Sequence, residues 1–137
     1  MKFFFDNNVA PAMAEAIAAL TRSQGIEIVH LKDRFPTNTP DPVWIAEIAA
    51  EGFVIISGDP RISRNPANRA AWLESGMTAF FFGDGWASKK LMVQAAELVR
   101  WWPTIVDTVK VCTPGSGFVL PVKGSTPTVI YQPDRST

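Results

Sequence analysis

Short apolar runs alternate with segments of helical periodicity along most of this chain. Four runs have the length and composition of buried strands and cover residues 2–5, 26–31, 53–57 and 78–82. Between and after them, apolar residues recur every three or four positions, over residues 11–23, 41–51, 65–74 and from about 88 onwards, as they do in amphipathic helices. Strands that alternate with helices are typical of a parallel sheet with helices on both faces. The pattern therefore predicts a three-layer α/β/α fold with a mostly parallel central sheet.

Local signals predict how two of the helices begin. Asp41 is followed by Pro42, and a capping side chain before a proline is a common helix start, so we expect Asp41 to be an N-cap. Asn8 is also a natural cap for the first helix, because asparagine is one of the favoured capping residues. Both side chains would then accept hydrogen bonds from backbone N–H groups in the first turn of their own helices.

Two features complicate the last helix. Pro103 should kink the helix or end it near Trp102, because proline cannot donate the intrahelical hydrogen bond. Trp101 and Trp102 are adjacent, and neighbouring residues point in different directions on a helix. We therefore expect one of the two indoles to be exposed or to lie at an interface.

The end of the chain differs in composition from the rest. We expect residues 1–112 to form the α/β domain and residues 113–137 to form a tail rich in Pro, Gly, Ser and Thr. Two apolar stretches in this tail, residues 118–120 and 129–131, could pair as a hairpin. Their flanking prolines would confine such strands to a sheet edge.

Length, charge and cysteine content narrow the class of protein. A chain of 137 residues fits one domain, and its 13 basic and 13 acidic residues cancel, which argues against a histone-like nucleic-acid binder. The sequence has no uninterrupted apolar run long enough to span a membrane and no apolar stretch typical of a signal peptide. Cys112 is the only cysteine, which fits a reducing compartment. A cytoplasmic protein is expected.

Three aspartates occupy corresponding positions in the predicted layout. Asp6 follows the first strand, Asp59 follows the third, and Asp41 opens the helix that leads to the third strand. The carboxyl ends of parallel strands lie at one edge of a sheet, where ligands bind in open α/β folds, so these carboxylates could share a site. Each also has a purely structural interpretation, as a helix cap or a turn opener. Spacing alone leaves both interpretations open.

Crowded carboxylates need a positive partner. Like charges repel in a cleft of low dielectric, and Mg²⁺ and Mn²⁺ prefer hard oxygen ligands. Such an ion lowers the pKa of a bound water and neutralises charge that develops on a phosphodiester. The aspartates therefore suggest a divalent metal centre that hydrolyses phosphate esters.

Three acidic segments resemble those of the PIN-like domains. They are Phe-Phe-Phe-Asp-Asn-Asn at residues 3–8, Asp-Pro-Val-Trp-Ile at 41–45 and Ile-Ile-Ser-Gly-Asp at 55–59. The similarity is to the short branch of this family and covers residues 1–82. PIN-like domains are small metal-dependent ribonucleases that include the VapC-type toxins of bacterial toxin–antitoxin pairs. The resemblance implies a Mg²⁺- or Mn²⁺-dependent endoribonuclease with Asp6, Asp41 and Asp59 as metal ligands, often dimeric and held inactive by an antitoxin.

One departure from the family pattern stands close to the third aspartate. Many PIN toxins carry a further acid two residues after it, where this chain has Arg61. Asn7, Asn8 or Asp84 could complete the coordination in its place. Loss of the fourth acid also allows a second function, a catalytically inactive PIN-like module that binds RNA or a protein.

Basic and amide side chains near the aspartates are candidates for substrate contacts. Arg61 and Arg64 could hold an RNA phosphate with forked hydrogen bonds, and Asn7 could assist. A salt bridge between Arg61 and Asp59 is the structural alternative. The single histidine, His30, is expected to be structural or to lie at the surface.

A third possible function is a phospho-acceptor receiver domain. Such domains also carry aspartates after the first and third strands. They need a lysine at the end of a later strand, and none follows residue 82 directly, so this is the least favoured of the three.

Overall fold

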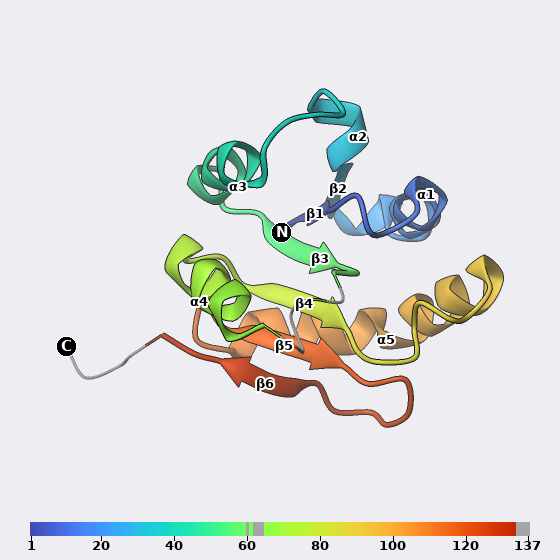
Figure 1. Ribbon diagram of the computed structural model, residues 1–137. Helices are drawn as coiled ribbons and strands as arrows, with labels where there is room; N and C mark the ends of the chain where they lie inside the picture. Colours follow the sequence, from blue (N-terminus) through green and yellow to red (C-terminus); the bar gives the residue numbers. More distant parts are fainter. Residues whose placement is uncertain (60, 62–64, 134–137) are drawn as a thin grey trace.

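The computed structural model forms three layers around one sheet (Figure 1). Residues 1–59, 61 and 65–133 are described. The strands are β1 (Lys2–Phe5), β2 (Glu27–His30), β3 (Val54–Ser57), β4 (Ala79–Phe82), β5 (Gly117–Leu120) and β6 (Thr128–Tyr131). The helices are α1 (Pro11–Leu20), the 3₁₀ turn η1 (Arg22–Gln24), α2 (Leu31–Arg34), α3 (Asp41–Ala50), α4 (Pro66–Ser75) and α5 (Leu91–Val111).

The sheet has the strand order β2-β1-β3-β4-β5-β6. Every neighbouring pair is parallel except β5 and β6, which are antiparallel. The chain moves from β1 to one side to form β2, and then crosses to the other side of β1 to form β3. A reversal of this kind opens a crevice at the carboxyl ends of the two strands beside it, here β1 and β3.

Alternate side chains of each strand pack on opposite faces, which creates two cores. Phe3 and Phe5 belong to the core beneath α1 and α5, whereas Phe4 belongs to the core beneath α3 and α4. This division follows from the two-residue period of a strand. Both faces are covered by helices, which is why the strands can be almost wholly apolar. The predicted three-layer α/β/α architecture is confirmed.

The structure contradicts one prediction for α5 and removes one of the two alternatives for Pro103. The helix continues through Pro103 and ends only at Val111, so the proline does not end it. The prediction that one of the two adjacent indoles is exposed was wrong. Trp101 and Trp102 are both buried, with 1% and 6% of their surface exposed. Adjacent residues are about 100° apart around a helix, and both indoles belong to the core between α5 and the sheet. A helix this well embedded can bury two neighbouring side chains.

The last described residues extend the sheet. β5 lies between β4 and β6, and its residues Phe118 and Leu120 pack in the core beneath α5. β6 forms the edge of the sheet and pairs with β5 as the predicted hairpin.

The two predicted caps next to the acidic segments are not observed. The N-cap of α1 is Ala10 and not Asn8, and the N-cap of α3 is Pro40 and not Asp41. The side chains of Asn8 and Asp41 therefore do not cap these helices. Across the described ranges of the chain, none of the helices combines the length and apolar character needed to cross a membrane.

Candidate active site

Asp6 and Asp59 are brought together by the pairing of β1 with β3. Phe5 lies opposite Ile56 in this parallel pair, and the Asp6 N–H donates to the Ile56 carbonyl at 3.2 Å. The residues that follow the two strands therefore leave the sheet side by side. Asp6 and Asp59 are each only 4% exposed. The topology thus buries two carboxylates at one edge of the sheet, as the sequence pattern predicted.

Gly58 lets the two loops after β1 and β3 approach closely. A Cβ atom at this position would lie 2.8 Å from the Asn8 carbonyl oxygen, closer than carbon and oxygen can approach without displacement. The glycine of the Ser-Gly-Asp segment is therefore a steric requirement of the site.

Asp6 is held by donors from both loops. Its Oδ1 accepts the Asn8 N–H at 3.0 Å and the Gly58 N–H at 3.5 Å, and its Oδ2 accepts the Ser57 hydroxyl. Burial raises the pKa of Asp6 to about 6, although these hydrogen bonds lower it, and the negative charge of Asp59 raises it further. The two carboxylates are thus close enough to repel each other.

Arg61 provides the positive charge that faces Asp59. Its Nε lies 3.0 Å from each oxygen of Asp59, its Nη2 lies 2.7 Å from Oδ2, and its backbone N–H donates to Oδ1 at 2.9 Å. Burial alone would raise the pKa of Asp59, but the hydrogen bonds and charge of Arg61 outweigh it and hold this pKa below its ordinary value. The salt bridge weighed as the structural alternative is present.

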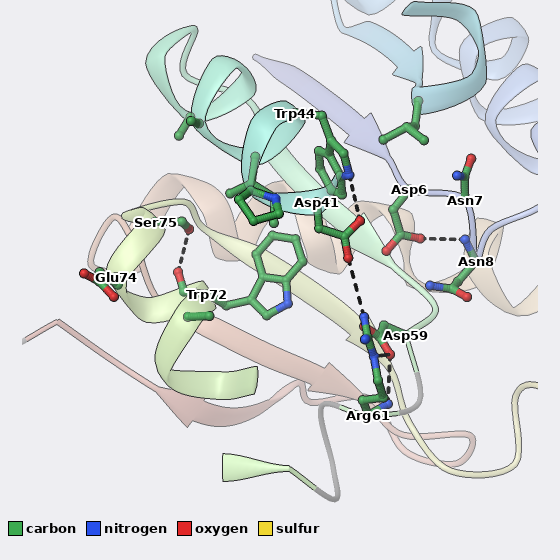
Figure 2. Close-up of a pocket in the computed structure, with 16 residues that line it drawn as sticks. Asp6, Asn7, Asn8, Asp41, Trp44, Asp59, Arg61, Trp72, Glu74 and Ser75 are labelled. Atoms are coloured by element: carbon green, nitrogen blue, oxygen red, sulfur yellow. Dashed lines mark hydrogen bonds and ion pairs between the residues drawn. The ribbon is translucent and has the colours of Figure 1, made fainter. Parts of the chain in front are cut away.

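Asp41 approaches the same guanidinium from α3. Its Oδ2 lies 3.7 Å from Arg61 Nη2, and its Oδ1 accepts the Trp44 indole N–H at 3.0 Å (Figure 2). The α3 helix runs antiparallel to the strand it precedes, so its first residue reaches the carboxyl edge of the sheet. Asp41 is therefore oriented by Trp44 toward the other two acids.

All three aspartates line one cavity of about 750 Å³. It begins at the carboxyl ends of β1 and β3 and continues between α3 and α4. Its walls are formed by Asp6, Asn7, Asn8, Leu31, Asp41, Pro42, Trp44, Ile45, Ala46, Ala49, Asp59, Arg61, Ala71, Trp72, Glu74 and Ser75. Figure 2 shows the acids converging on this cavity from separate segments. We call the part lined by Asp6, Asp41 and Asp59 the acidic end.

The acidic end has the donor chemistry of a Mg²⁺ or Mn²⁺ site, because it offers carboxylate oxygens from three segments. The repulsion between Asp6 and Asp59 is the kind that a cation relieves. Within residues 1–59, 61 and 65–133, however, no three His, Cys, Asp or Glu side chains are gathered closely enough to hold a metal ion. Arg61 contacts the carboxylates of Asp59 and Asp41 and would have to move before these groups could bind a metal ion. The residues fit the ion by chemistry once this arginine is displaced.

Residues 1–84 match the family model described as a PIN like domain. The matched segment is more than half of the chain and contains all three aspartates. The chain belongs to the PIN-like domain family. No curated protein and no solved structure matches it.

The remaining predicted residues of the PIN-like domain are divided between two hollows. Asn7 and Asn8 line the cavity with the aspartates. Asp84 instead lines a smaller hollow of about 270 Å³ beyond Asn8, at the ends of β3 and β4. Arg64 lies outside the described residues. Of the additional oxygen ligands considered from sequence, only the two asparagines share the cavity of the acids.

His30 is structural, as predicted. The side chain is buried; its Nε2 lies 2.7 Å from the Val9 carbonyl oxygen, and its Nδ1 accepts the Lys32 N–H at 3.0 Å. The ring ties the end of β2 to the loop after β1.

Two supporting residues of the PIN-like domain were not predicted. Ser57 donates its hydroxyl to Asp6 and accepts the Asp59 N–H at 3.1 Å, so it joins the two buried acids. Trp44 orients Asp41. Ser57 could have been noticed from sequence, because it is a polar residue at the end of the otherwise apolar β3. Nothing in the sequence distinguished Trp44 from a core tryptophan.

Proposed function

We propose that this PIN-like domain is a metal-dependent endoribonuclease that hydrolyses RNA phosphodiester bonds. The observation that carries the proposal is the convergence of Asp6, Asp41 and Asp59, from three separate segments, on one cavity. These carboxylates would hold Mg²⁺ or Mn²⁺, and one of them would also orient the attacking water. The expected products carry a 5′-phosphate and a 3′-hydroxyl.

The bound ion would activate water and neutralise negative charge on the phosphate. The protein's own part is to hold the three carboxylates in place. Ser57 and the backbone N–H groups of Asn8 and Gly58 fix the orientation of Asp6, and Trp44 fixes that of Asp41. Preorganisation of this kind avoids rearrangement during the reaction.

Arg61 would change partner in this reaction. Its forked hydrogen bonds to Asp59 compensate the acid in the metal-free protein. Once a cation takes over that role, the guanidinium becomes available for an RNA phosphate, which it can bind in the same bidentate manner. Its side chain is 59% exposed, so it can make this contact at the surface.

Replacement of Asp59 by Asn tests the proposal most directly. The purified parent should cleave single-stranded RNA only with Mg²⁺ or Mn²⁺. Asp59→Asn should reduce the rate by more than the roughly 10–100-fold typical of losing a group that merely supports a metal ligand. Asp107→Asn, at an exposed position of α5, is the matched control and should cleave like the parent. If Asp59→Asn cleaves as fast as the parent, the assignment is wrong.

A second candidate is a catalytically inactive PIN-like module that binds RNA or a protein. The position of Arg61 favours it, because this residue neutralises Asp59 and reaches Asp41 without a metal ion. It predicts that binding is unchanged by a chelator. Strict dependence of binding and cleavage on a divalent ion would eliminate it.

We further propose that the chain is the cytoplasmic toxin of a toxin–antitoxin pair, acts on RNA as a homodimer and is inhibited by an antitoxin protein. Membership of the PIN-like family supports this role. Expression of the parent in a bacterium should arrest growth, and expression of Asp59→Asn should not. Equal growth arrest by the two would contradict a toxic nuclease activity.

A further inference from the structure

The cavity extends well beyond the acidic end. From there it continues as a groove between α3 and α4, which we call the α3–α4 groove. The groove is lined by Ile45, Ala46, Ala49, Ala71 and Trp72, and also by the polar residues Glu74 and Ser75 of α4. The alanines on the facing sides of the two helices leave the space between them unfilled. A volume of about 750 Å³ lies within the range of pockets for small organic ligands. A hydrated metal ion and a phosphate would occupy only part of it.

Trp72 presents an unused hydrogen-bond donor to this space. Only 6% of its surface is exposed, and Figure 2 shows it projecting from α4 into the cavity, with the indole nitrogen on the side nearer to Asp59 and Arg61 in this view. Among the described residues, none accepts a hydrogen bond from its Nε1. Because this nitrogen is open to the cavity and not sealed in the core, a ligand or water can accept its hydrogen bond.

The other tryptophans show why this donor is distinctive. The Trp44 indole N–H is bonded to Asp41 and the Trp86 indole N–H to the Leu120 carbonyl. The Nε1 atoms of Trp101 and Trp102 are sealed in the core without a partner in the described part of the chain. The Trp72 nitrogen is not sealed in this way, and its side chain lines the cavity.

We infer that the α3–α4 groove is a nucleobase subsite for the nucleotide whose phosphate lies at the acidic end. A base is flat and apolar on its faces, which suits walls of Ile45 and alanine. It carries carbonyl oxygens or ring nitrogens on its edge, which can accept the Trp72 N–H. The groove and the acidic end belong to one cavity, so a single nucleotide can span both. This inference rests on the proposed action on RNA and specifies how a substrate nucleotide is held.

Two small ligands distinguish the contribution of the base to binding from that of the phosphate. Uridine 5′-monophosphate and ribose 5-phosphate share the sugar and phosphate, and only the first has a base. With Mn²⁺ present, calorimetry should give a Kd about 10-fold lower for the nucleotide, since base contacts with apolar and aromatic walls contribute on this scale. Equal Kd values for the two ligands would overturn the inference.

Two variants test the residues of the groove. Trp72→Phe keeps a ring but removes the N–H, and should raise the Kd of uridine 5′-monophosphate by about 2–10-fold. Ala46→Leu should fill the groove and raise that Kd to the value for ribose 5-phosphate. Neither change should alter the affinity for ribose 5-phosphate. Ala96→Leu, at an exposed position of α5, is the control and should bind both ligands like the parent.

The outcomes distinguish this inference from the proposed activity. RNA cleavage by the parent, with no preference for the nucleotide over ribose 5-phosphate, would overturn the subsite and leave the nuclease standing. The parent could instead prefer the nucleotide to ribose 5-phosphate, with this preference reduced by Trp72→Phe and Ala46→Leu, and yet cleave no RNA with any divalent ion present. That result would support the subsite and contradict the proposed nuclease activity. A groove that binds neither ligand would suit an apolar side chain of a protein partner, and that result overturns the inference.

Discussion

Asp6 should make the stability of this protein depend on pH in a direction opposite to that of an aspartate whose charge is stabilised by a salt bridge. Burial raises its pKa to about 6 in the folded state, compared with about 4 in an unfolded chain. The folded protein therefore binds more protons than the unfolded chain between these pH values. Its free energy of unfolding is highest when Asp6 is protonated and falls as the pH rises through about 6. The cost of the buried charge reaches about 3 kcal/mol above about pH 7.

Asp6→Asn removes this cost while keeping the size of the side chain. The amide oxygen can still accept the Asn8 N–H, but the bond in which Ser57 donates to the carboxylate is lost, at a cost of about 1 kcal/mol. In EDTA at about pH 7.5, the variant should be more stable than the parent by about 2 kcal/mol, or by about 5–10 °C in Tm. At about pH 4, the variant should be no more stable than the parent.

Urea unfolding in EDTA across this pH range, followed by circular dichroism, measures the difference. Asp107→Asn, at an exposed position of α5, is the control and should follow the parent at every pH. If Asp6→Asn lowers the free energy of unfolding at about pH 7.5, or keeps the pH dependence of the parent, the buried charge does not carry the cost assigned to it. A stabilising Asp6→Asn that abolishes RNA cleavage would show that stability is given up for function at this position.

Three further predictions follow from the geometry. Arg61→Ala should lower the Kd for Mn²⁺, measured by electron paramagnetic resonance, by about 5-fold. The reason is that the ion pair between Asp59 and the exposed Arg61 side chain, worth about 1 kcal/mol, no longer competes with the metal. Unchanged affinity would mean that Arg61 does not compete. Mn²⁺ at about 100 times its Kd should stabilise the parent by about 3 kcal/mol in thermal unfolding, and Asp59→Asn should lose most of this effect. Gly117→Ala would place a Cβ 2.1 Å from the Tyr131 ring and should destabilise the fold by about 1–3 kcal/mol in urea. The same change should cost less in a Tyr131→Leu background, and full additivity would contradict the clash.

Much of the fold could be predicted from local pattern. The apolar runs that form β1, β3 and β4 are continuous because strands buried on both faces are continuously apolar. The run that forms β2 lies at the edge of the sheet and is only partly buried. The alternation with helical periods predicted parallel pairing, since parallel neighbours need a crossover connection. Errors appeared where packing overrides local preference. Trp101 and Trp102 are both buried by a helix embedded more deeply than its amphipathic stripe indicated.

The candidate site was also predictable only in part. That Asp6 and Asp59 would share an edge was predictable, because each follows a strand and parallel strands end together. The orientation of the side chains was not predictable. Asp41 has the sequence context of a cap, yet its helix begins one residue earlier than expected and its carboxylate is bound by Trp44. Asn8 likewise lines the cavity and caps no helix.

The sequence by itself determined which segments become strands and helices, because hydrophobic period is a local property. It also placed an acid directly after each of two strands and at the start of a helix. That these acids meet at one edge of the sheet depends on the pairing of β1 with β3. Only the tertiary structure decided that Arg61 would contact both Asp59 and Asp41, and that Ser57 would join Asp59 to Asp6. It alone decided that Trp72 would line the groove between α3 and α4. The contacts of Arg61 with Asp41 and of Ser57 with Asp6 join residues from separate segments, so their geometry depends on how the strands and helices pack and not on the order of residues in any one of them.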